Sequence, residues 1–266
     1  MHPILNVAMM AAREAGEIIT RYFGEIDRLT IEEKAKNNFV SEVDMLAEQA
    51  IIRTIQKYYP QHGILAEETG SQAEKSDTQW IIDPLDGTTN FLHQFPQFSV
   101  SIAVMEKGRL THAVVFDPLR DEMFHASRGE GARLNNRRIR VTEQKNLDKA
   151  LLATGFPYYE FDYVDSYLAS FKAFMTSTAG IRRAGSAALD LAYVAAGRVD
   201  GYWEFNLKPW DIAAGILLVK EAGGLCTDFA GGENQLESGN VLACAPKLMK
   251  PMAQVLTQTI PAELRK

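Results

Sequence analysis

The segment Asp83-Pro84-Leu85-Asp86-Gly87-Thr88 constrains this chain more than any other. It follows an apolar run at residues 80–82 and sets two carboxylates three positions apart. The proline favours an extended backbone at Asp83, and Gly87 allows a tight turn that brings both side chains toward one point. Carboxylates this close repel each other unless a cation lies between them, and a ligand set made only of oxygen favours Mg²⁺ over zinc. The alternative is an Asx-type turn with solvated aspartates.

Other acidic residues also lie at the ends of predicted elements. A strand-like run ends in Glu67 and Glu68, while Asp44 and Asp211 each stand at the start of a helical pattern. Because side chains at element ends can converge on one cleft, these acids are candidates for the same site as the first segment. Each also has a structural alternative. Asp211 could simply cap its helix, and Asp44 could be an acid of the first helical turn. The two glutamates could lie in a solvated loop.

Composition sets broad limits. A chain of 266 residues with 46% hydrophobic content can bury a substantial core, as one unit or as two packed halves. Residues 1–10 lack the pattern of a signal peptide, and no segment approaches the roughly 18 apolar residues of a membrane span, so we expect a cytoplasmic protein. The net charge of −6 argues against broad binding of nucleic acid phosphates. Cys226 and Cys244 lack metal-ligand spacing and are expected to be reduced thiols.

Hydrophobic periodicity predicts a mixture of helices and strands. Apolar residues recur at helical spacing over residues 4–22 and 45–58, and strand-like runs over residues 98–126 predict an antiparallel meander. From residue 151 onward, strand-like and helical patterns alternate. The pattern alone gives no more than a mixed α and β class.

Several motifs together resemble those of the inositol monophosphatase family. They are Glu67-Glu68-Thr69, residues 83–91, Gly185-Ser186-Ala187-Ala188, residues 210–215 and Glu221-Ala222-Gly223-Gly224. The similarity runs from about Lys34 to about Ala245, and residues 182–186 and 195–201 resemble the bacterial inositol-1-monophosphatase branch. The resemblance implies an α+β fold, a layered α-β-α-β-α sandwich of the inositol monophosphatase and fructose-1,6-bisphosphatase type. Residues 1–145 would carry most metal ligands, and residues 146–266 would carry Asp211 and the substrate contacts.

The resemblance also implies two Mg²⁺ sites. Glu67, Asp83 and the backbone carbonyl of Leu85 would hold the first ion, and Asp83, Asp86 and Asp211 would hold the second. Glu67 is also expected near a weaker third ion. A backbone carbonyl is a reasonable ligand at Leu85, because a turn residue between a proline and a glycine has no ladder partner for its oxygen. The second ion is expected to make the enzyme sensitive to lithium.

Catalytic and substrate contacts follow from the same resemblance. Asp44 and Thr88 would orient the attacking water, with Glu67 as a further catalytic group. Glu204 would accept a hydrogen bond from a hydroxyl of an inositol ring, although a solvated strand end is its structural alternative. The implied substrate contacts are Asp86, Gly87, Thr88, Gly185, Ser186, Ala187, Glu204 and Asp211. Lys34, or its neighbour Lys36, corresponds to a family lysine near the metal cleft.

Some segments depart from the family pattern. Asn38 and Ser41 stand where family members commonly carry an aspartate and a threonine, and residues 156–159 read Phe156-Pro157-Tyr158-Tyr159. These changes leave the implied metal ligands intact. They affect the expected site of the third ion and the expected width of the substrate pocket.

The leading interpretation is a Mg²⁺-dependent phosphomonoesterase that hydrolyses inositol 1-phosphate and related polyol phosphates. By the same resemblance, we expect a homodimer. One alternative is fructose-1,6-bisphosphatase or 3′(2′),5′-bisphosphate nucleotidase activity, which would require further cations or a base-stacking surface near the cleft. Another is a partner in transcription antitermination that contacts RNA polymerase or Nus factors and keeps a secondary phosphatase activity. Arg182, Arg183 and Arg198 could make that contact, or could serve a dimer interface or a pocket edge. We expect no direct nucleic acid binding and no membrane association.

Overall fold

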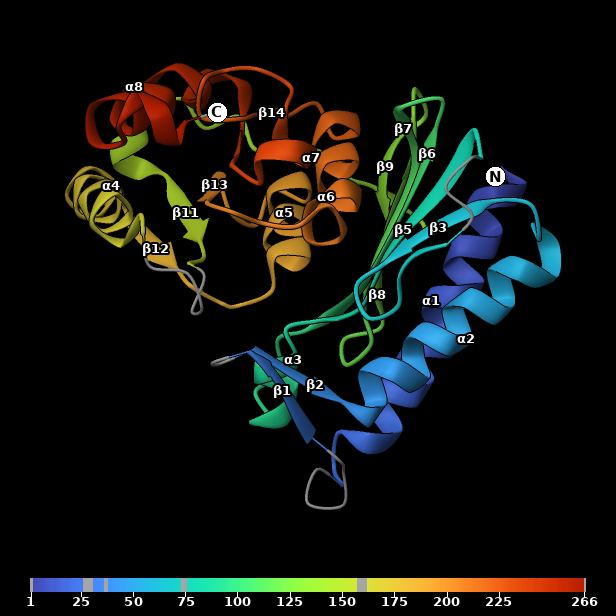
Figure 1. Cartoon of the computed structure of the whole chain (residues 1–266). Coiled ribbons are helices and arrows are strands. Elements are labelled where there is room, and N and C mark those ends of the chain that lie inside the picture. Colours follow the sequence, from blue (N-terminus) through green and yellow to red (C-terminus); the bar gives the residue numbers. More distant parts are fainter. Residues whose placement is uncertain (1, 26–30, 36–37, 73–75, 157–161, 266) are drawn as a thin grey trace.

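Helical and sheet layers alternate through the molecule. The computed structural model describes residues 2–25, 31–35, 38–72, 76–156 and 162–265, with side chains for all of these except residues 31–40. From one side to the other, Figure 1 shows α1 and α2, a large sheet, α5 and α6, a smaller sheet, and finally α4 and α8. Separate clusters of buried apolar residues fill the interfaces between these layers. The predicted α-β-α-β-α sandwich is confirmed.

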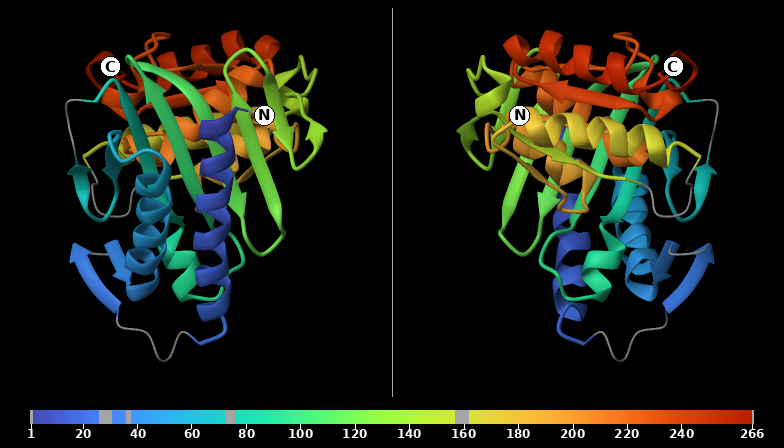
Figure 2. Two further views of the ribbon diagram at one scale, coloured as in Figure 1. Left: turned by 90° about the vertical axis from the view of Figure 1, so that its right-hand side faces the viewer. Right: turned by 90° about the vertical axis from the view of Figure 1, so that its left-hand side faces the viewer.

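Helices α1 (Pro3–Tyr22) and α2 (Glu42–Tyr58) lie side by side on one face of the large sheet (Figure 2). Their apolar residues recur at helical spacing and are buried against the sheet. Ser41 and Asp44 form a capping box at the start of α2, in which each side chain satisfies backbone N–H groups of the first turn. This cap fixes the position of Asp44. The hairpin of β1 (Ile31–Ala35) and β2 (Asn38–Ser41) leads into it.

The large sheet has eight strands in the order β10-β9-β8-β7-β6-β5-β3-β4. Their bounds are β3 (Gly63–Ala66), β4 (Gly70–Gln72), β5 (Thr78–Asp86), β6 (Ser99–Glu106), β7 (Arg109–Asp117), β8 (Glu122–Ser127), β9 (Gly131–Leu134) and β10 (Arg137–Arg138). Strands β6, β7 and β8 form the predicted antiparallel meander. Strand β5 pairs with β6 in antiparallel and with β3 in parallel fashion, so the sheet is mixed.

Strand β5 differs from its prediction in one respect that matters for the site. The sequence predicted that the strand ends at Asp83 and turns, whereas β5 continues to Asp86 with a bulge between the two aspartates. Asp83 lies opposite Ser101 and Asp86 lies opposite Ser99. Because Ser99 and Ser101 are two positions apart, they share one face of the sheet, and the extra residue in the bulge brings both aspartates onto the same face. Pro84, which has no N–H to donate, sits inside this bulge.

The second half builds a smaller sheet with the order β12-β11-β13-β15-β14. Its strands are β11 (Leu151–Thr154), β12 (Gly180–Arg182), β13 (Gly201–Glu204), β14 (Leu225–Thr227) and β15 (Val241–Cys244). Helices α5 (Ala187–Ala195) and α6 (Pro209–Glu221) are buried between the two sheets, while α4 (Val164–Ser177) and α8 (Met249–Thr259) cover the outer face (Figure 2). The remaining helices, α3 (Thr88–Leu92) and α7 (Gln235–Ser238), are short.

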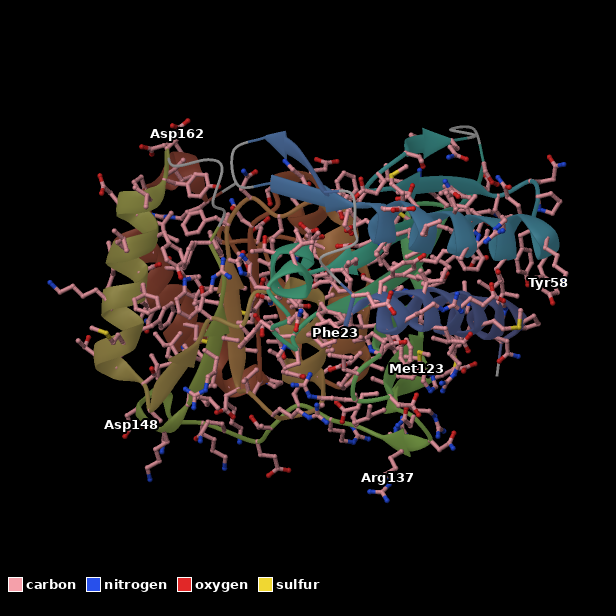
Figure 3. All side chains as sticks on the ribbon, turned by 90° about the horizontal axis from the view of Figure 1, so that it is seen from below. Phe23, Tyr58, Met123, Arg137, Asp148 and Asp162 are labelled. Atoms are coloured by element: carbon pink, nitrogen blue, oxygen red, sulfur yellow. The ribbon has the colours of Figure 1, made fainter. Side chains whose placement is uncertain are left out.

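Side chains fill the spaces between layers, whereas Arg137 and Asp148 point away from the body (Figure 3). Both cysteines are buried and free, as expected. Among the described residues, no helix is both long enough and apolar enough to cross a bilayer. The division expected between residues 145 and 146 falls in the connection between the two sheets. The assignment of residues 1–145 and 146–266 as two halves packed into one globular unit stays a prediction.

Candidate functional site

A cavity of about 280 Å³ lies where the two halves of the chain meet. Its walls come from the loop after β3, the end of β5, the end of β13, and the first turns of α5 and α6. We call the region around Glu67, Asp83, Asp86 and Asp211 the acid end, and the region around Gly155, Arg183, Asp190 and Glu204 the far end. All of these residues except Asp83 line the cavity, and Asp83 is buried.

Asp86 is held from the second half of the chain. Its Oδ2 accepts hydrogen bonds from Ser186 Oγ at 2.6 Å and from the N–H of Ala188 at 2.8 Å. Burial raises the pKa of Asp86 to about 6, although these bonds and one from the N–H of Ala187 oppose the rise. Since Ala187 and Ala188 spend their N–H groups on Asp86, the start of α5 positions this carboxylate. The substrate contacts assigned to Gly185, Ser186 and Ala187 from the sequence stay predictions.

Asp83 and Asp211 lie near other acids, whose charges raise the pKa values of both carboxyls. Burial raises the pKa of Asp83 well above its usual range, and the charges of Glu67, Asp86 and Asp211 raise it further. A hydrogen bond joins the carboxyls of Asp83 and Glu67. Burial and then the charges of Glu67 and Asp86 likewise raise the pKa of Asp211, whose Oδ2 accepts from the N–H of Lys208 at 2.7 Å and begins α6. Asp211 thus both caps its helix and faces the cavity.

The acids at this end could hold a cation, although their side chains are not yet arranged at metal-ligand distances. Within the described parts of the chain, no three His, Cys, Asp or Glu side chains are already gathered at metal-ligand distances. The pairwise effects on the carboxyl pKa values nevertheless show that the acids are neighbours. Carboxylates that repel one another separate when no cation is present and converge around one. The oxygen-only donor set fits Mg²⁺.

Asp44, Thr88 and Leu85 form a connected group beside the acid end. Thr88 Oγ1 lies 2.8 Å from Asp44 Oδ1 and 3.1 Å from the carbonyl oxygen of Leu85. The other oxygen of Asp44 accepts from the backbone and hydroxyl of Ser41. Burial raises the pKa of Asp44 despite these bonds. The side chain of Thr88 thus contacts the carbonyl oxygen of Leu85, which the sequence predicted to lack a ladder partner, and the second lone pair of this oxygen remains for another ligand.

The turn after β5 is locked by close backbone contacts. Gly87 has φ of 103°, and a Cβ there would lie 3.0 Å from the carbonyl oxygen of Gln97 and 3.2 Å from that of Gly185. Asn90 Nδ2 donates to the carbonyl oxygens of Gln97 at 2.7 Å and Ala184 at 2.9 Å. Asn90 thus ties the first half of the chain to the loop that leads into α5.

Glu204 and Asp190 lie at the far end. Burial raises the pKa of Glu204 to about 7, and its Oε2 accepts a hydrogen bond from the hydroxyl of Tyr202. Glu204 is only 8% exposed, so the structural alternative of a solvated strand end is wrong. Asp190, from the first turn of α5, is 3% exposed, and burial raises its pKa well above the usual range.

Sequence reasoning missed Glu48, Asn90 and Asp190. Both oxygens of the buried Glu48 accept backbone N–H groups, those of Glu68 and Thr69, and so fix the turn that carries Glu67. An acid on an apolar helix face was the available signal for Glu48, and its position within the helical run 187–196 was the signal for Asp190. Asn90 belongs to the motif of residues 83–91, but nothing in the sequence indicated its hydrogen bonds to Gln97 and Ala184.

The basic candidates differ in their surroundings. Arg198 binds Glu122 through both terminal nitrogens of its guanidinium. The guanidinium of Arg183 lies 4.3 Å from the ring centroid of Phe156 at the cavity wall, and Arg182 is exposed. Lys36 and residues 157–159 lie outside the described residues, and of Lys34 and Asn38 only the backbone is described. The expectations for these positions stay predictions.

Comparisons with known proteins agree with this architecture. The model of the inositol monophosphatase family matches residues 1–261. The Nus factor SuhB of Pseudomonas aeruginosa is 51% identical over 271 residues that cover 100% of both chains, and that of Escherichia coli K12 is 51% identical over 253 residues, 95% of each.

Solved structures are similar as well. The extragenic suppressor protein suhB from Bartonella henselae has a TM-score of 0.94 at 42% identity and covers 97% of this chain and 100% of its own. The Thermotoga maritima IMPase has a TM-score of 0.89 at 36% identity, with 99% of this chain and 100% of its own covered. The family match over residues 1–261 and the full-length relatives show that the chain belongs to the inositol monophosphatase family, in the branch of the SuhB proteins.

Proposed function

We propose that this chain acts as a transcription factor of the Nus type that retains a metal-dependent phosphomonoesterase site. The observation that carries the first part is similarity along the full length, at 51% identity, to a protein named Nus factor SuhB. It supports the transcription partnership, an alternative in the sequence analysis, better than a role as an inositol 1-phosphatase alone. RNA polymerase or another Nus factor is the expected partner, which implies a cytoplasmic protein.

The phosphomonoesterase site is proposed for the acid end of the cavity. Glu67, Asp83 and the carbonyl oxygen of Leu85 would hold one Mg²⁺, and Asp83, Asp86 and Asp211 a second. The raised pKa values of Asp83, Asp86 and Asp211 support this set, because buried carboxylates that repel one another are stabilised by a divalent cation. When bound, Mg²⁺ lowers the pKa of water and neutralises phosphate oxygens.

Asp44 and Thr88 would orient the attacking water. The hydroxyl of Thr88 has one proton for two acceptors, Asp44 at 2.8 Å and Leu85 at 3.1 Å. Donation to Asp44 directs that proton away and leaves the lone pairs of Thr88 Oγ1 to accept a hydrogen bond from water. Ser41 holds Asp44 through two further hydrogen bonds, so the pair is fixed before substrate arrives.

Phosphate and polyol would occupy different walls of the cavity. The N–H groups of Gly87 and Thr88, at the start of a helical turn, suit phosphate oxygens. Glu204 would accept a hydrogen bond from a polyol hydroxyl, because each such hydroxyl must donate somewhere. We therefore expect inositol 1-phosphate and related polyol monophosphates as substrates.

Lithium sensitivity and a homodimer remain expectations of this proposal. Li⁺ is close to Mg²⁺ in size but carries half the charge, so it suits a small carboxylate site from which Mg²⁺ leaves readily. Inhibition by Li⁺, on the order of millimolar, should be uncompetitive toward the organic substrate and weaker in Asp211→Asn. Analytical ultracentrifugation of the purified chain measures the oligomeric state.

One experiment separates the two parts of the proposal. Wild type and Asp86→Asn are each used to capture purified RNA polymerase and Nus factors, and each is assayed for phosphate release from a panel of polyol, sugar and nucleotide phosphates. We expect both proteins to capture the same partners, while only wild type releases phosphate. A wild-type chain that captures no partner would overturn the transcription role, and one that hydrolyses nothing on the panel would overturn the enzymatic role.

A further inference from the structure

Four exposed arginines lie close together in the chain at one edge of the large sheet. Arg133 belongs to β9, Arg137 and Arg138 form β10, and Arg140 follows two residues later. Strand β10 is the last strand of the sheet, and Figure 3 shows Arg137 pointing away from the body. We call residues 133–149 the basic strip. It contains six Lys or Arg residues and two Asp or Glu residues, whereas the whole chain has a net charge of −6.

The fold gives these arginines like charges as neighbours. In the register of β9 and β10, Arg138 lies directly opposite Arg133, so both side chains project from the same face of the sheet. Like charges at directly opposite positions destabilise a strand pair. Within the described part of the chain, none of the four arginines makes an ion pair, whereas Arg13, Arg120 and Arg198 each bind a carboxylate. The arrangement therefore indicates an anion that comes from outside the chain.

The basic surface continues beyond the hairpin of β9 and β10. Arg140 and Lys247 line a cavity of about 370 Å³, together with Glu143. A side-chain hydrogen bond with Lys145 and the charge of that ammonium lower the pKa of Lys247, and the charge of Glu143 opposes the shift. Two ammonium groups side by side repel each other, and an anion between them would relieve this repulsion.

The charges also have a structural alternative. Charged side chains on an edge strand keep two sheets from pairing edge to edge, and this use is sufficient to explain Arg137 and Arg138. It does not explain Arg140, Lys145 and Lys247, which lie outside the strands. It also gives no reason for positive charge to predominate in one segment of an acidic chain.

The surroundings of the basic strip favour RNA over a protein as the partner. Interfaces between proteins are centred on apolar and aromatic anchors, and none of the large hydrophobic side chains found exposed in the described residues lies within residues 133–149. A phosphate backbone needs no such anchor, and the guanidinium of arginine binds phosphate through two parallel N–H groups. Because the strip follows one segment of chain, it suits a single flexible strand.

We propose that the basic strip, with Lys247, binds the phosphate backbone of single-stranded RNA without reading its sequence. The inference rests on the proposed transcription role and adds a contact to it, since a transcript lies near any protein bound to a transcribing RNA polymerase. Without exposed aromatic side chains in the strip, bases have nothing to stack on, so every sequence should bind alike.

The proposal departs from the expectation of no direct nucleic acid binding. The net charge of −6 disfavours binding over the whole surface, and it confines the contact to the part of the surface where positive charge predominates. We expect a Kd on the order of 1–100 µM for RNA alone, as for sequence-independent binding. Such weak binding is sufficient when protein partners hold the chain beside the transcript, because they raise the effective concentration of RNA.

Fluorescence anisotropy with a labelled single-stranded RNA of about 20 nucleotides tests the strip over salt concentrations of about 50 to 200 mM. The combined variant Arg137→Gln, Arg138→Gln and Arg140→Gln should bind at least ~10-fold more weakly than wild type. The slope of log K against log salt should become shallower by about 2, because each phosphate contact contributes about 0.7. The matched control, Arg21→Gln, Arg53→Gln and Lys57→Gln, removes three exposed charges from α1 and α2 and should keep the slope of wild type.

Replacing the same three arginines of the strip by lysine keeps their charges and should keep the slope. An equal loss of binding in the lysine and glutamine variants would therefore overturn the inference, as would equal binding by the glutamine variant and its control. A wild type that binds polyglutamate but no RNA would assign the strip to an acidic protein instead. Failure of wild type to capture RNA polymerase or Nus factors would contradict the proposed function, and anisotropy with RNA alone would still decide the strip.

Discussion

The two ends of the cavity hold their carboxyls in different ways. At the acid end, Asp86 and Asp211 each accept at least one strong hydrogen bond from a helix start, and the neighbouring Asp44 is braced on both oxygens. At the far end, Glu204 has one partner and Asp190 has none among the described residues. A braced carboxyl offers a fixed lone pair, which suits a cation with strict geometry. A carboxyl with free acceptors suits substrates whose hydroxyls vary.

The braces also show how the halves of the chain depend on each other. Ser186 and Ala188 belong to the second half yet hold Asp86 of the first, and Asn90 of the first half holds the loop before Ser186. The acid end is therefore assembled only when both sheets are packed. The far end, by contrast, is built from the second half alone. Substitutions at the acid end should consequently affect turnover, and those at the far end should affect choice of substrate.

The largest effect is expected for Asp86→Asn. The amide keeps the size of the side chain but removes the charge proposed to bind the second Mg²⁺, so kcat for inositol 1-phosphate should fall by ~100-fold or more. Steady-state kinetics with circular dichroism as a check of folding measure this. Asp148→Asn, exposed and outside the cavity, is the matched control. Near-normal turnover by Asp86→Asn would contradict the claim that the acid end, and not the far end, determines turnover.

Thr88→Ala should have the next largest effect. Losing the hydroxyl that lies 2.8 Å from Asp44 leaves water without its proposed acceptor, so kcat should fall about 30-fold while Mg²⁺ affinity changes little. Thr88→Ser restores the hydroxyl and should recover most of the activity. Kinetics at several Mg²⁺ concentrations separate the two parameters, and a parallel loss of Mg²⁺ affinity would mean that Thr88 supports the metal ligands instead.

Ser186→Ala tests the brace on Asp86. The variant loses the hydrogen bond to Asp86 at 2.6 Å and also the side-chain cap of α5. We expect kcat to fall about tenfold and the free energy of unfolding to fall by about 1 kcal/mol. Ser170→Ala is the control, because Ser170 is equally buried and lies outside the cavity. If both variants lost the same activity, packing rather than the brace would explain the effect.

The smallest effect concerns stability at the far end. Burial raises the pKa of Glu204 from 4.5 to about 7, so the unfolded chain releases this proton at lower pH than the folded chain does. The destabilisation is absent below pH 4.5, grows as pH rises, and is complete above about 7. Glu204→Gln has no such proton. In metal-free buffer, its Tm relative to wild type should therefore increase between these pH values, whereas a constant difference would contradict the raised pKa.

The sequence predicted the layers, the meander and the acids of the motifs, because periodicity and local motifs report which elements form and where they end. It could not predict the bulge in β5, since the register depends on pairing with β6. It missed that Ala187 and Ala188 serve Asp86, because that contact joins segments about 100 residues apart. It missed Asp190 entirely, because the place of Asp190 on the cavity wall depends on how α5 packs in the fold. An acid within an apolar helical run has no local feature that distinguishes a cavity wall from a solvated face.

The proposal that the acid end holds Mg²⁺ has the most direct test in the thermal stability of the metal-free chain. The Tm of wild type and of Asp86→Asn is measured in EDTA and again with Mg²⁺ on the order of millimolar. Because clustered carboxylates repel one another until a cation binds the folded state, Mg²⁺ should raise the Tm of wild type and raise that of Asp86→Asn much less. An equal response of the two proteins, or none in wild type, would contradict a metal site at the acid end.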